Sequence, residues 1–593
     1  MLFPILLALA GPAPAAAVLS APITNIQYDI TFTRATAATR SLHVAMQFDV
    51  TGTGDVVLSL PAWTPGAYEM TWFAKWVSSF TPTAASKELR WDKVDFDTWR
   101  IRTGGARHVQ VDFDYQADSF DNAMGWSKAD FAFFNGTNVL LYPEGRGFSF
   151  PATVRITTES DWRVATGMHP AAGSGYTEKN YHDLVDMPFF VGAFDYDSAL
   201  VGGVNARLAT YPAGTLSGAA REAFWTDYRR MFAPQAAVFG ETPYDTYTTM
   251  MVFDSSSQGG SALEHQSSHV GLYTPTGIGQ SWVSSVTAHE MFHAFNVKRL
   301  RPADMVPYRY DAPQPTPWLW VSEGITDYYA DLTMLRGGIA DSAEFLNTTG
   351  GKISTIDQAT PVALEDASLT TWIHPTDGTG YLYYPKGSLA GFMLDILIRD
   401  ASDNRRSLDD VMRQAYRNTY KKGLGFDGRE WWGDVKLAAG REFPGFNDRF
   451  IDGRDVYPWD SVLPLAGLRL RSDTTFLPRL GINTTVDSSG TRLIQIVPGG
   501  AGAAAGMQVG DLLLSLGTVT ISGEVTFQQF RETYAGKDGT EFPIVVMRSG
   551  SRLTLTGTVR AVANVTTQLV ADPAASPKAA RIRNGIFHGK TGN

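Results

Sequence analysis

The chain has 593 residues, too many for one hydrophobic core, so we expect three or four domains. Apolar residues make up 44% and charged residues 19%, a balance typical of globular proteins. The net charge of −10 argues against a general nucleic-acid or anionic-membrane binder. The lack of cysteine in the sequence excludes disulfides, cysteine-zinc sites and a thiol nucleophile.

Residues 1–21 are typical of a secretory signal peptide. Their apolar run is short and interrupted by proline and glycine, so it cannot span a bilayer, and small-residue patterns permit cleavage near Ala17 or Ala21. No Lys or Arg precedes the run, which leaves a buried apolar start as the alternative. We expect an exported protein, periplasmic or secreted, and no membrane span in the rest of the chain.

Two different apolar spacings divide the region from 22 to 470. In residues 22–198 apolar side chains alternate, as Val44, Met46 and Phe48 do in "HVAMQFDV", and turn-rich pieces separate such runs. This pattern predicts an N-terminal all-β, sandwich-like domain. In residues 199–470 short strands give way to helical spacing, as in "SWVSSVTAHEMFHAF" and "GSLAGFMLDILIRDA", which predicts an α+β domain.

Residues 477–562 resemble a PDZ domain of the bacterial protease-associated type. The matching parts include the loop of Leu480, Gly481 and Ile482 and the pair Gly510 and Asp511 that opens a strand. The resemblance implies that this loop binds a C-terminal peptide. Residues 563–593, with Ala, Pro, Lys and Arg, predict a flexible tail.

The segment "TAHEMFHAF" (287–295) carries the strongest chemical signal. On a helix, residues four apart lie on one face, so His289 and His293 can present imidazole nitrogens to one metal ion, with Glu290 beside them. Zinc suits nitrogen and oxygen ligands and keeps a position open for water. The pattern therefore predicts a zinc site rather than a helix with two partly exposed histidines.

A third ligand is expected in "WVSEGITDYYADL", thirty residues beyond His293. Glu323 and Asp327 are four apart and share one face of a second predicted helix, so one carboxylate can bind the ion while the other accepts the ring N–H of a ligating histidine. The apolar neighbours of this pair, such as Trp320 and Ile325, argue against a solvated face.

These motifs together resemble the glycyl aminopeptidase family of zinc metallopeptidases, which combines a thermolysin-like catalytic domain with a C-terminal PDZ domain. The resemblance rests on "HEMFHAFNVKRLRP" followed by "EGITDYY", on "LPAWTPGAYEM" (60–70) and "HDLVDMPFFVGAF" (182–194), and on "LEHQSS" (263–268). It implies one Zn²⁺ per chain held by His289, His293 and Glu323, with Glu290 as general base.

The resemblance also implies residues that meet the substrate. Tyr384, or failing that Tyr383, would donate to the oxyanion, and Glu264 on an edge strand would bind the substrate ammonium, with Gly260 lining the substrate. The glycine pair before Leu-Glu-His is displaced by Ser261 and Ala262. Beyond the zinc helix, the basic run "KRLR" (298–301) either caps the helix or binds a substrate carboxylate.

The predicted function is an exported zinc aminopeptidase that releases small N-terminal residues, Gly and less readily Ala, from peptides with a free N-terminus. Two alternatives stay open: a PDZ-tethered endopeptidase with the same zinc site, and a catalytically vestigial PDZ binding protein.

Overall fold

The structure, a computed structural model, describes residues 19–592 apart from 174, 488 and 522–525. It divides into two compact units, one made of Met1–Arg469 with Ala571–Asn593, the other of Leu470–Val570. The predicted signal peptide lies almost wholly outside the described residues. No helix in the described part of the chain is long and apolar enough to cross a membrane.

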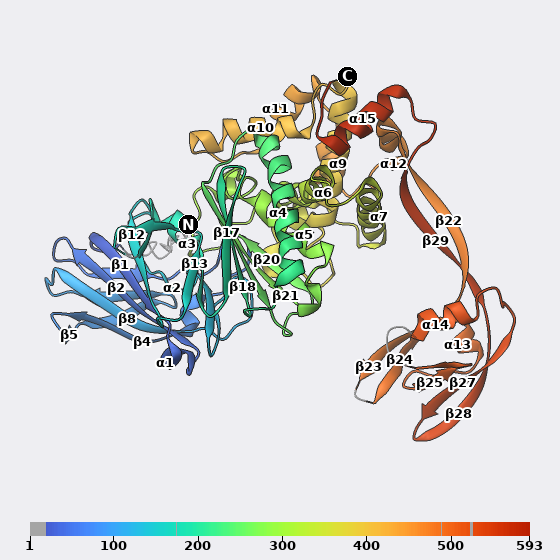
Figure 1. Ribbon diagram of the computed structural model, residues 1–593, viewed down its shortest axis with the longest axis horizontal. Helices are drawn as coiled ribbons and strands as arrows, with labels where there is room; N and C mark the ends of the chain where they lie inside the picture. Colours follow the sequence, from blue (N-terminus) through green and yellow to red (C-terminus); the bar gives the residue numbers. More distant parts are fainter. Residues whose placement is uncertain (1–18, 174, 488, 522–525, 593) are drawn as a thin grey trace, which may run out of the picture. The chain divides into compact units, whose positions relative to one another are not determined.

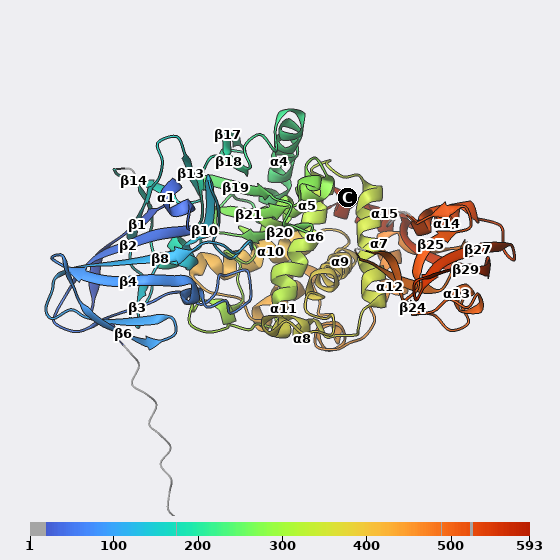
Figure 2. The same ribbon diagram turned by 90° about the horizontal axis from the view of Figure 1, so that it is seen from below.

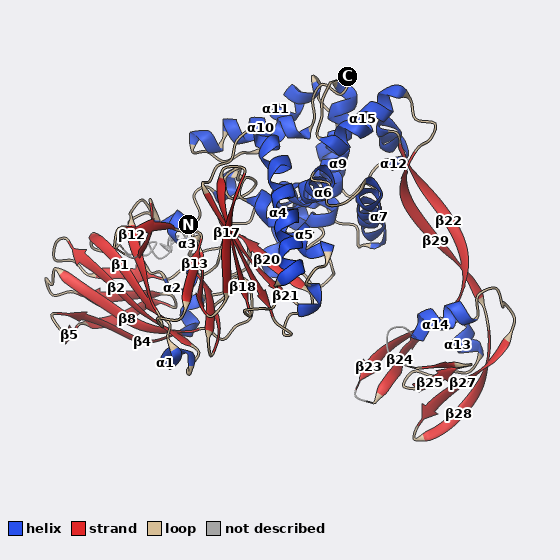
Figure 3. Ribbon diagram, viewed as in Figure 1, coloured by secondary structure: helices blue, strands red, loops and turns tan. Residues whose placement is uncertain are grey.

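The N-terminal part of the first unit is built of strands, as Figure 3 shows in red. Alternate residues of "HVAMQFDV" are buried, as the apolar alternation predicts. One sheet has the order β14 (His169–Ala171), β15 (Gly175–Glu178), β12 (Ala152–Thr157), β1 (Ile23–Thr31), β2 (Ser41–Val50), β8 (His108–Gln116), β4 (Val77–Ala84), β5 (Lys87–Glu88). A second sheet has the order β13 (Arg163–Thr166), β16 (Pro188–Gly192), β10 (Phe131–Asn135), β9 (Trp126–Lys128). A third has the order β11 (Tyr142–Pro143), β3 (Val56–Ser59), β7 (Thr98–Arg102), β6 (Arg90–Asp95).

A mixed sheet opens the second part of this unit, residues 195–469 (Figure 1). Its order is β17 (Asp195–Val201), β18 (Val204–Tyr211), β19 (Thr246–Phe253), β21 (Ser268–Tyr273), β20 (Gly260–Glu264). Strand β20 pairs antiparallel with β21 and forms an edge of this sheet. Strand β17 begins at Asp195 and belongs to this sheet, so the boundary expected at 198 falls inside a strand.

Helices complete this second part, seen from another side in Figure 2. Their bounds are α4 (Gly218–Phe239), α5 (Ser281–His293), the π-helical turn η4 (Trp320–Ile325), α6 (Thr326–Arg336), α7 (Ser342–Gln358), α8 (Leu364–Thr370), α9 (Tyr383–Ala401), α10 (Leu408–Asn418), α11 (Gly428–Ala439) and α12 (Trp459–Val462). Helices α4 and α5 share a core with the sheet through residues such as Trp225, Met251 and Met291. This packing fixes α5 on the sheet beside the edge strand β20.

The second unit is a small β-rich module with its own core. Its sheet has the order β23 (Ile482–Asp487), β24 (Gly490–Ile496), β25 (Leu512–Leu516), β27 (Glu541–Arg548), β28 (Ser551–Thr558), with β26 (Val519–Thr520) paired to β25 and the helices α13 (Ala501–Ala504) and α14 (Thr526–Thr533). The two-stranded ribbon of β22 (Leu468–Pro478) and β29 (Ala561–Ala571) brings the chain into the module and out again.

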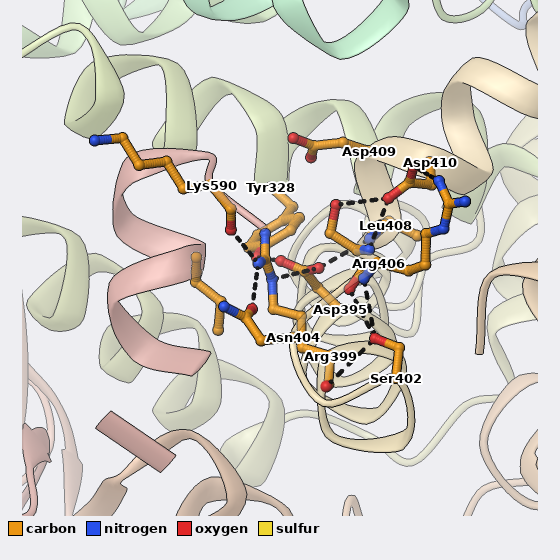
Figure 4. A network of polar contacts seen from close by, with 12 residues as sticks. Tyr328, Asp395, Arg399, Ser402, Asn404, Arg406, Leu408, Asp409, Asp410 and Lys590 are labelled. Atoms are coloured by element: carbon orange, nitrogen blue, oxygen red, sulfur yellow. Dashed lines mark hydrogen bonds and ion pairs between the residues drawn. The ribbon is translucent and has the colours of Figure 1, made fainter. Parts of the chain in front are cut away.

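The prediction of a flexible tail over 563–593 is wrong. The chain forms β29 and then α15 (Pro577–His588), which begins at a Ser576 cap with proline at its first position and buries Ile582 and Ile586. The tail packs on α9, where Arg399 donates from Nη1 to the Lys590 carbonyl at 2.8 Å and to Asn404 at 2.9 Å (Figure 4). The second unit is therefore an insertion in the first.

Candidate active site

Helix α5 presents its two histidines on the face turned away from the sheet. Val283, Ala288 and Met291 bury the opposite side of α5 in the core with α4 and the sheet. His289 and His293 then lie one turn apart, and their Nε2 atoms are 2.9 Å from each other. The expected i, i+4 pair is thus formed by ordinary packing of an apolar helix face.

Glu323 joins the histidine pair from the π-helical turn η4. Its Oε2 lies 3.6 Å from His289 Nε2 and 3.1 Å from His293 Nε2. A tetrahedral zinc ion with bonds of about 2.0–2.1 Å spaces its ligand atoms roughly 3.3 Å apart. The three atoms fit one such ion. His289, His293 and Glu323 therefore form a cluster of side chains that could hold one metal ion, named the metal cluster below.

Two glycines let η4 and α9 approach closely enough to bring Glu323 and Tyr384 together. A Cβ on Gly324 would lie 2.5 Å from both the Gly387 Cα and the Tyr383 carbonyl oxygen, and a Cβ on Gly387 would lie 2.8 Å from the Trp320 carbonyl oxygen. Any larger residue at either position would separate the two elements, because these contacts are with backbone atoms.

The ring orientation of His293 is fixed by a backbone carbonyl, not by Asp327. His293 Nδ1 lies 2.8 Å from the Asn296 carbonyl oxygen, and the Asn296 amide donates to the Val321 carbonyl at 2.8 Å. Asp327 forms an ion pair with Lys352 instead. Its expected role is therefore wrong for His293 and stays a prediction for His289. The π-helical turn explains the difference, because residues four apart no longer stack as they do in an α-helix.

Glu290 is buried beside the metal cluster. Burial raises its pKa to about 8, and its Oε2 has no hydrogen-bond partner among the described residues. A carboxyl group whose pKa lies this close to neutral can both accept and release a proton there, as general acid–base catalysis requires.

Of the two candidate tyrosines, Tyr384 faces the cluster. Its ring centroid lies 5.9 Å from that of His289, and burial and the charge of Glu323 raise its pKa well above the usual value. The phenol therefore stays protonated and able to donate. The Tyr383 hydroxyl lies 3.3 Å from that of Thr371, within hydrogen-bond reach.

Glu264 ends the edge strand β20 and is 4% exposed. Ligand atoms of Glu264, Glu290 and His293 all lie within 4.8 Å of one another, so the carboxylate borders the metal cluster. Gly260 is at the other end of β20, roughly 13 Å away along the strand. It packs against Trp282, where a Cβ would lie 2.4 Å from the indole, so its expected place beside the substrate is not supported.

Residues of the N-terminal domain complete the surroundings of Glu264, and sequence reasoning did not single them out. A Cβ on Gly66 would lie 2.6 and 2.7 Å from the two Glu264 carboxylate oxygens. Lys298, buried, donates to Asp186 at 2.8 Å and to the Pro65 carbonyl at 3.1 Å, and lies 3.6 Å from Glu264. The available signal was that 65–66 and 186 fall in the two segments that carry the family resemblance.

The basic run after α5 is thus structural. Arg299 donates to the Ala294 carbonyl at 2.7 Å, at the C-terminal end of α5, while Arg301 donates to the Val297 carbonyl at 3.1 Å and stacks on Tyr308.

Two family models match separate segments of the chain. The family model of the Peptidase M61 N-terminal domain matches residues 27–193, and that of the M61 glycyl aminopeptidase matches residues 282–390, which contain the histidine pair, Glu323 and Tyr384. No curated protein matches the chain.

A solved structure shares the fold. An aminopeptidase N family protein from Idiomarina loihiensis is 20% identical, with 95% of this chain and 100% of that chain covered at a TM-score of 0.79. Weaker similarity is found to an M1 zinc metallopeptidase from Deinococcus radiodurans (16% identity, 75% of this chain and 97% of that chain covered, TM-score 0.48) and to yeast LTA4 hydrolase with bestatin (12% identity, 75% and 71% covered, TM-score 0.47). The resemblance inferred from the sequence is confirmed by both family models, and the protein is a metallopeptidase with an M61-type N-terminal domain and an M61-type peptidase segment.

Proposed function

We propose that the protein is a zinc-dependent aminopeptidase with one zinc ion per chain, held by His289, His293 and Glu323. The observation that carries this proposal is the buried Glu264 carboxylate beside the metal cluster. An endopeptidase needs no anion at that place, whereas an aminopeptidase must bind the free ammonium of its substrate.

The surroundings of Glu264 support this role. Among the described residues its Oε1 accepts no hydrogen bond, and Lys298 at 3.6 Å is too distant to donate one. A buried carboxylate oxygen without a hydrogen-bonded partner is costly, so a substrate ammonium that supplies one is favoured. The edge position of β20 also lets the substrate backbone pair alongside the strand.

Bound zinc would supply Lewis acidity to the scissile carbonyl and to the attacking water. In this arrangement Glu290 accepts the proton of the water and delivers it to the leaving amine. Tyr384 donates a hydrogen bond to the oxyanion that develops on the carbonyl oxygen. The preference for Gly over Ala is a proposal that rests on the likeness to the glycyl aminopeptidase model.

The test is a panel of aminoacyl anilides and peptides, each assayed with a free and an acetylated N-terminus, with and without a chelator. We expect chelator-sensitive release of Gly and, more slowly, Ala from the free forms. Equal cleavage of free and acetylated substrates would establish an endopeptidase instead.

Export and peptide binding by the second unit belong to the same proposal. Residues 1–21 support export by their signal-like composition. In the second unit, the edge strand β23 and helix α14 border a groove lined by Leu480, Ile482, Phe527 and Phe530, where an extended C-terminal peptide could add to the sheet as in a PDZ domain.

A further inference from the structure

Tyr68, from the N-terminal domain, lies beside Glu323 and forms a hydrogen bond with only one of its two carboxylate oxygens. Its hydroxyl donates to Oε1 at 2.7 Å. The other oxygen, Oε2, is the one that faces the imidazole nitrogens of His289 and His293. The carboxylate is thus divided between a hydrogen-bond donor and the metal cluster.

The backbone around Tyr68 has an unfavourable conformation. Tyr68 has φ +50°, a left-handed conformation that bulky residues rarely adopt, and Gly66 has φ +110°. Tyr68 is 3% exposed, and its ring centroid lies 6.2 Å from that of Trp372 in an edge-to-face arrangement. The Pro65 carbonyl is bound by Lys298 at 3.1 Å.

We propose that Tyr68 is a positioning residue that keeps Glu323 a one-oxygen ligand. A carboxylate with both oxygens free can present both to a metal ion, whereas a catalytic zinc site needs three protein ligands and one open position. By engaging Oε1, Tyr68 leaves Oε2 alone for the ion and keeps the remaining position open for substrate. This inference rests on the proposed zinc site but not on the substrate.

The experiment compares the full-length Tyr68→Phe variant with the wild type. We expect the zinc dissociation constant, measured by competition with a chromogenic chelator, to rise 10- to 100-fold, as for other residues that hold a metal ligand. The visible absorption spectrum of the cobalt-substituted protein should change in the direction that indicates a higher coordination number of the metal ion, because both Glu323 oxygens become free to bind it. Tyr181→Phe is the matched control: it removes another buried tyrosine hydroxyl of the same domain, which donates to the Leu140 carbonyl, and should leave both readouts unchanged.

A double-mutant cycle separates this role from a general loss of folding. In a Glu323→Ala background Tyr68 has no carboxylate to hold, so adding Tyr68→Phe should leave the weakened zinc affinity unchanged. A similar further loss in that background, or wild-type zinc affinity and cobalt spectrum in Tyr68→Phe alone, would overturn the proposal. Because neither readout uses a peptide, the outcome is independent of whether the substrate assignment is right.

Discussion

Replacing Glu264 by glutamine tests whether the protein recognises a free N-terminus. The change keeps the shape of the side chain and removes the charge that would pair with the substrate ammonium. Loss of one partner of a buried charge pair costs about 2–5 kcal/mol. Since each 1.36 kcal/mol is tenfold, we expect kcat/KM for glycyl substrates to fall by a factor of roughly 30 to several thousand.

The structure indicates that this loss would come from binding and not from unfolding. Lys298, the nearest cation to Glu264, keeps its 2.8 Å contact with Asp186 and its 3.1 Å contact with the Pro65 carbonyl in the variant. No buried cation is therefore left unpaired. The variant should retain the melting temperature and zinc content of the wild type within experimental error.

The assay measures kcat/KM on glycyl-p-nitroanilide and on its N-acetyl form for both proteins. Glu178→Gln is a suitable control, because this carboxylate is 8% exposed but pairs with His169 in the N-terminal domain. We expect the acetylated substrate to be poor for the wild type and no worse for Glu264→Gln. If Glu264→Gln lowered the rates on both substrates equally, or on neither, the amine-binding role would be refuted.

Other predictions concern the base, the oxyanion donor and the inserted unit. Glu290→Gln should retain zinc, measured by metal analysis, and lose turnover; near-normal kcat would exclude the general-base role. Tyr384→Phe should lower kcat by about 10²–10³, whereas Tyr383→Phe, whose hydroxyl lies beside that of Thr371, should lower it far less; the reverse order would reassign the donor. Replacing residues 470–570 by a short Gly-Ser linker should preserve activity on an aminoacyl anilide, but truncation at 475 should lower the melting temperature because it also removes α15. A large loss of activity in a folded linker variant would show that the second unit supports the active site.

The parts of the site that could be predicted are those that follow from the spacing of residues within one short segment. The i, i+4 histidines and the carboxylate of the second helical segment follow from residues close in the sequence. Tyr68 could not be found in this way, because 255 residues separate it from Glu323. Lys298 and Asp186 are 112 residues apart, and only the fold shows that the lysine pairs with an N-terminal-domain carboxylate rather than with solvent.

Two expectations failed for local reasons that the sequence conceals. Asp327 was placed on the face of Glu323 by assuming an α-helix, and the π-helical turn changes that angle. The composition of the tail predicts flexibility, although Ser576 and Pro577 form a helix start and Ile582 and Ile586 recur at helical spacing. The average composition of a segment does not reveal such short helix signals.

The insertion of the second unit has a consequence for the order of folding during synthesis. Gly467 and Asp572, at the two ends of the insertion, are joined by a backbone hydrogen bond of 2.8 Å, and Arg399 finds its Lys590 partner only 191 residues later. The ribosome must therefore make the whole second unit before α15 can close over α9. Until then Arg399, fully buried in the finished protein, lacks the Lys590 carbonyl, one of the two oxygens to which its Nη1 donates. A nascent chain that already contains the zinc ligands should therefore not yet be fully folded. The peptidase should reach its final structure only after the inserted module has left the ribosome.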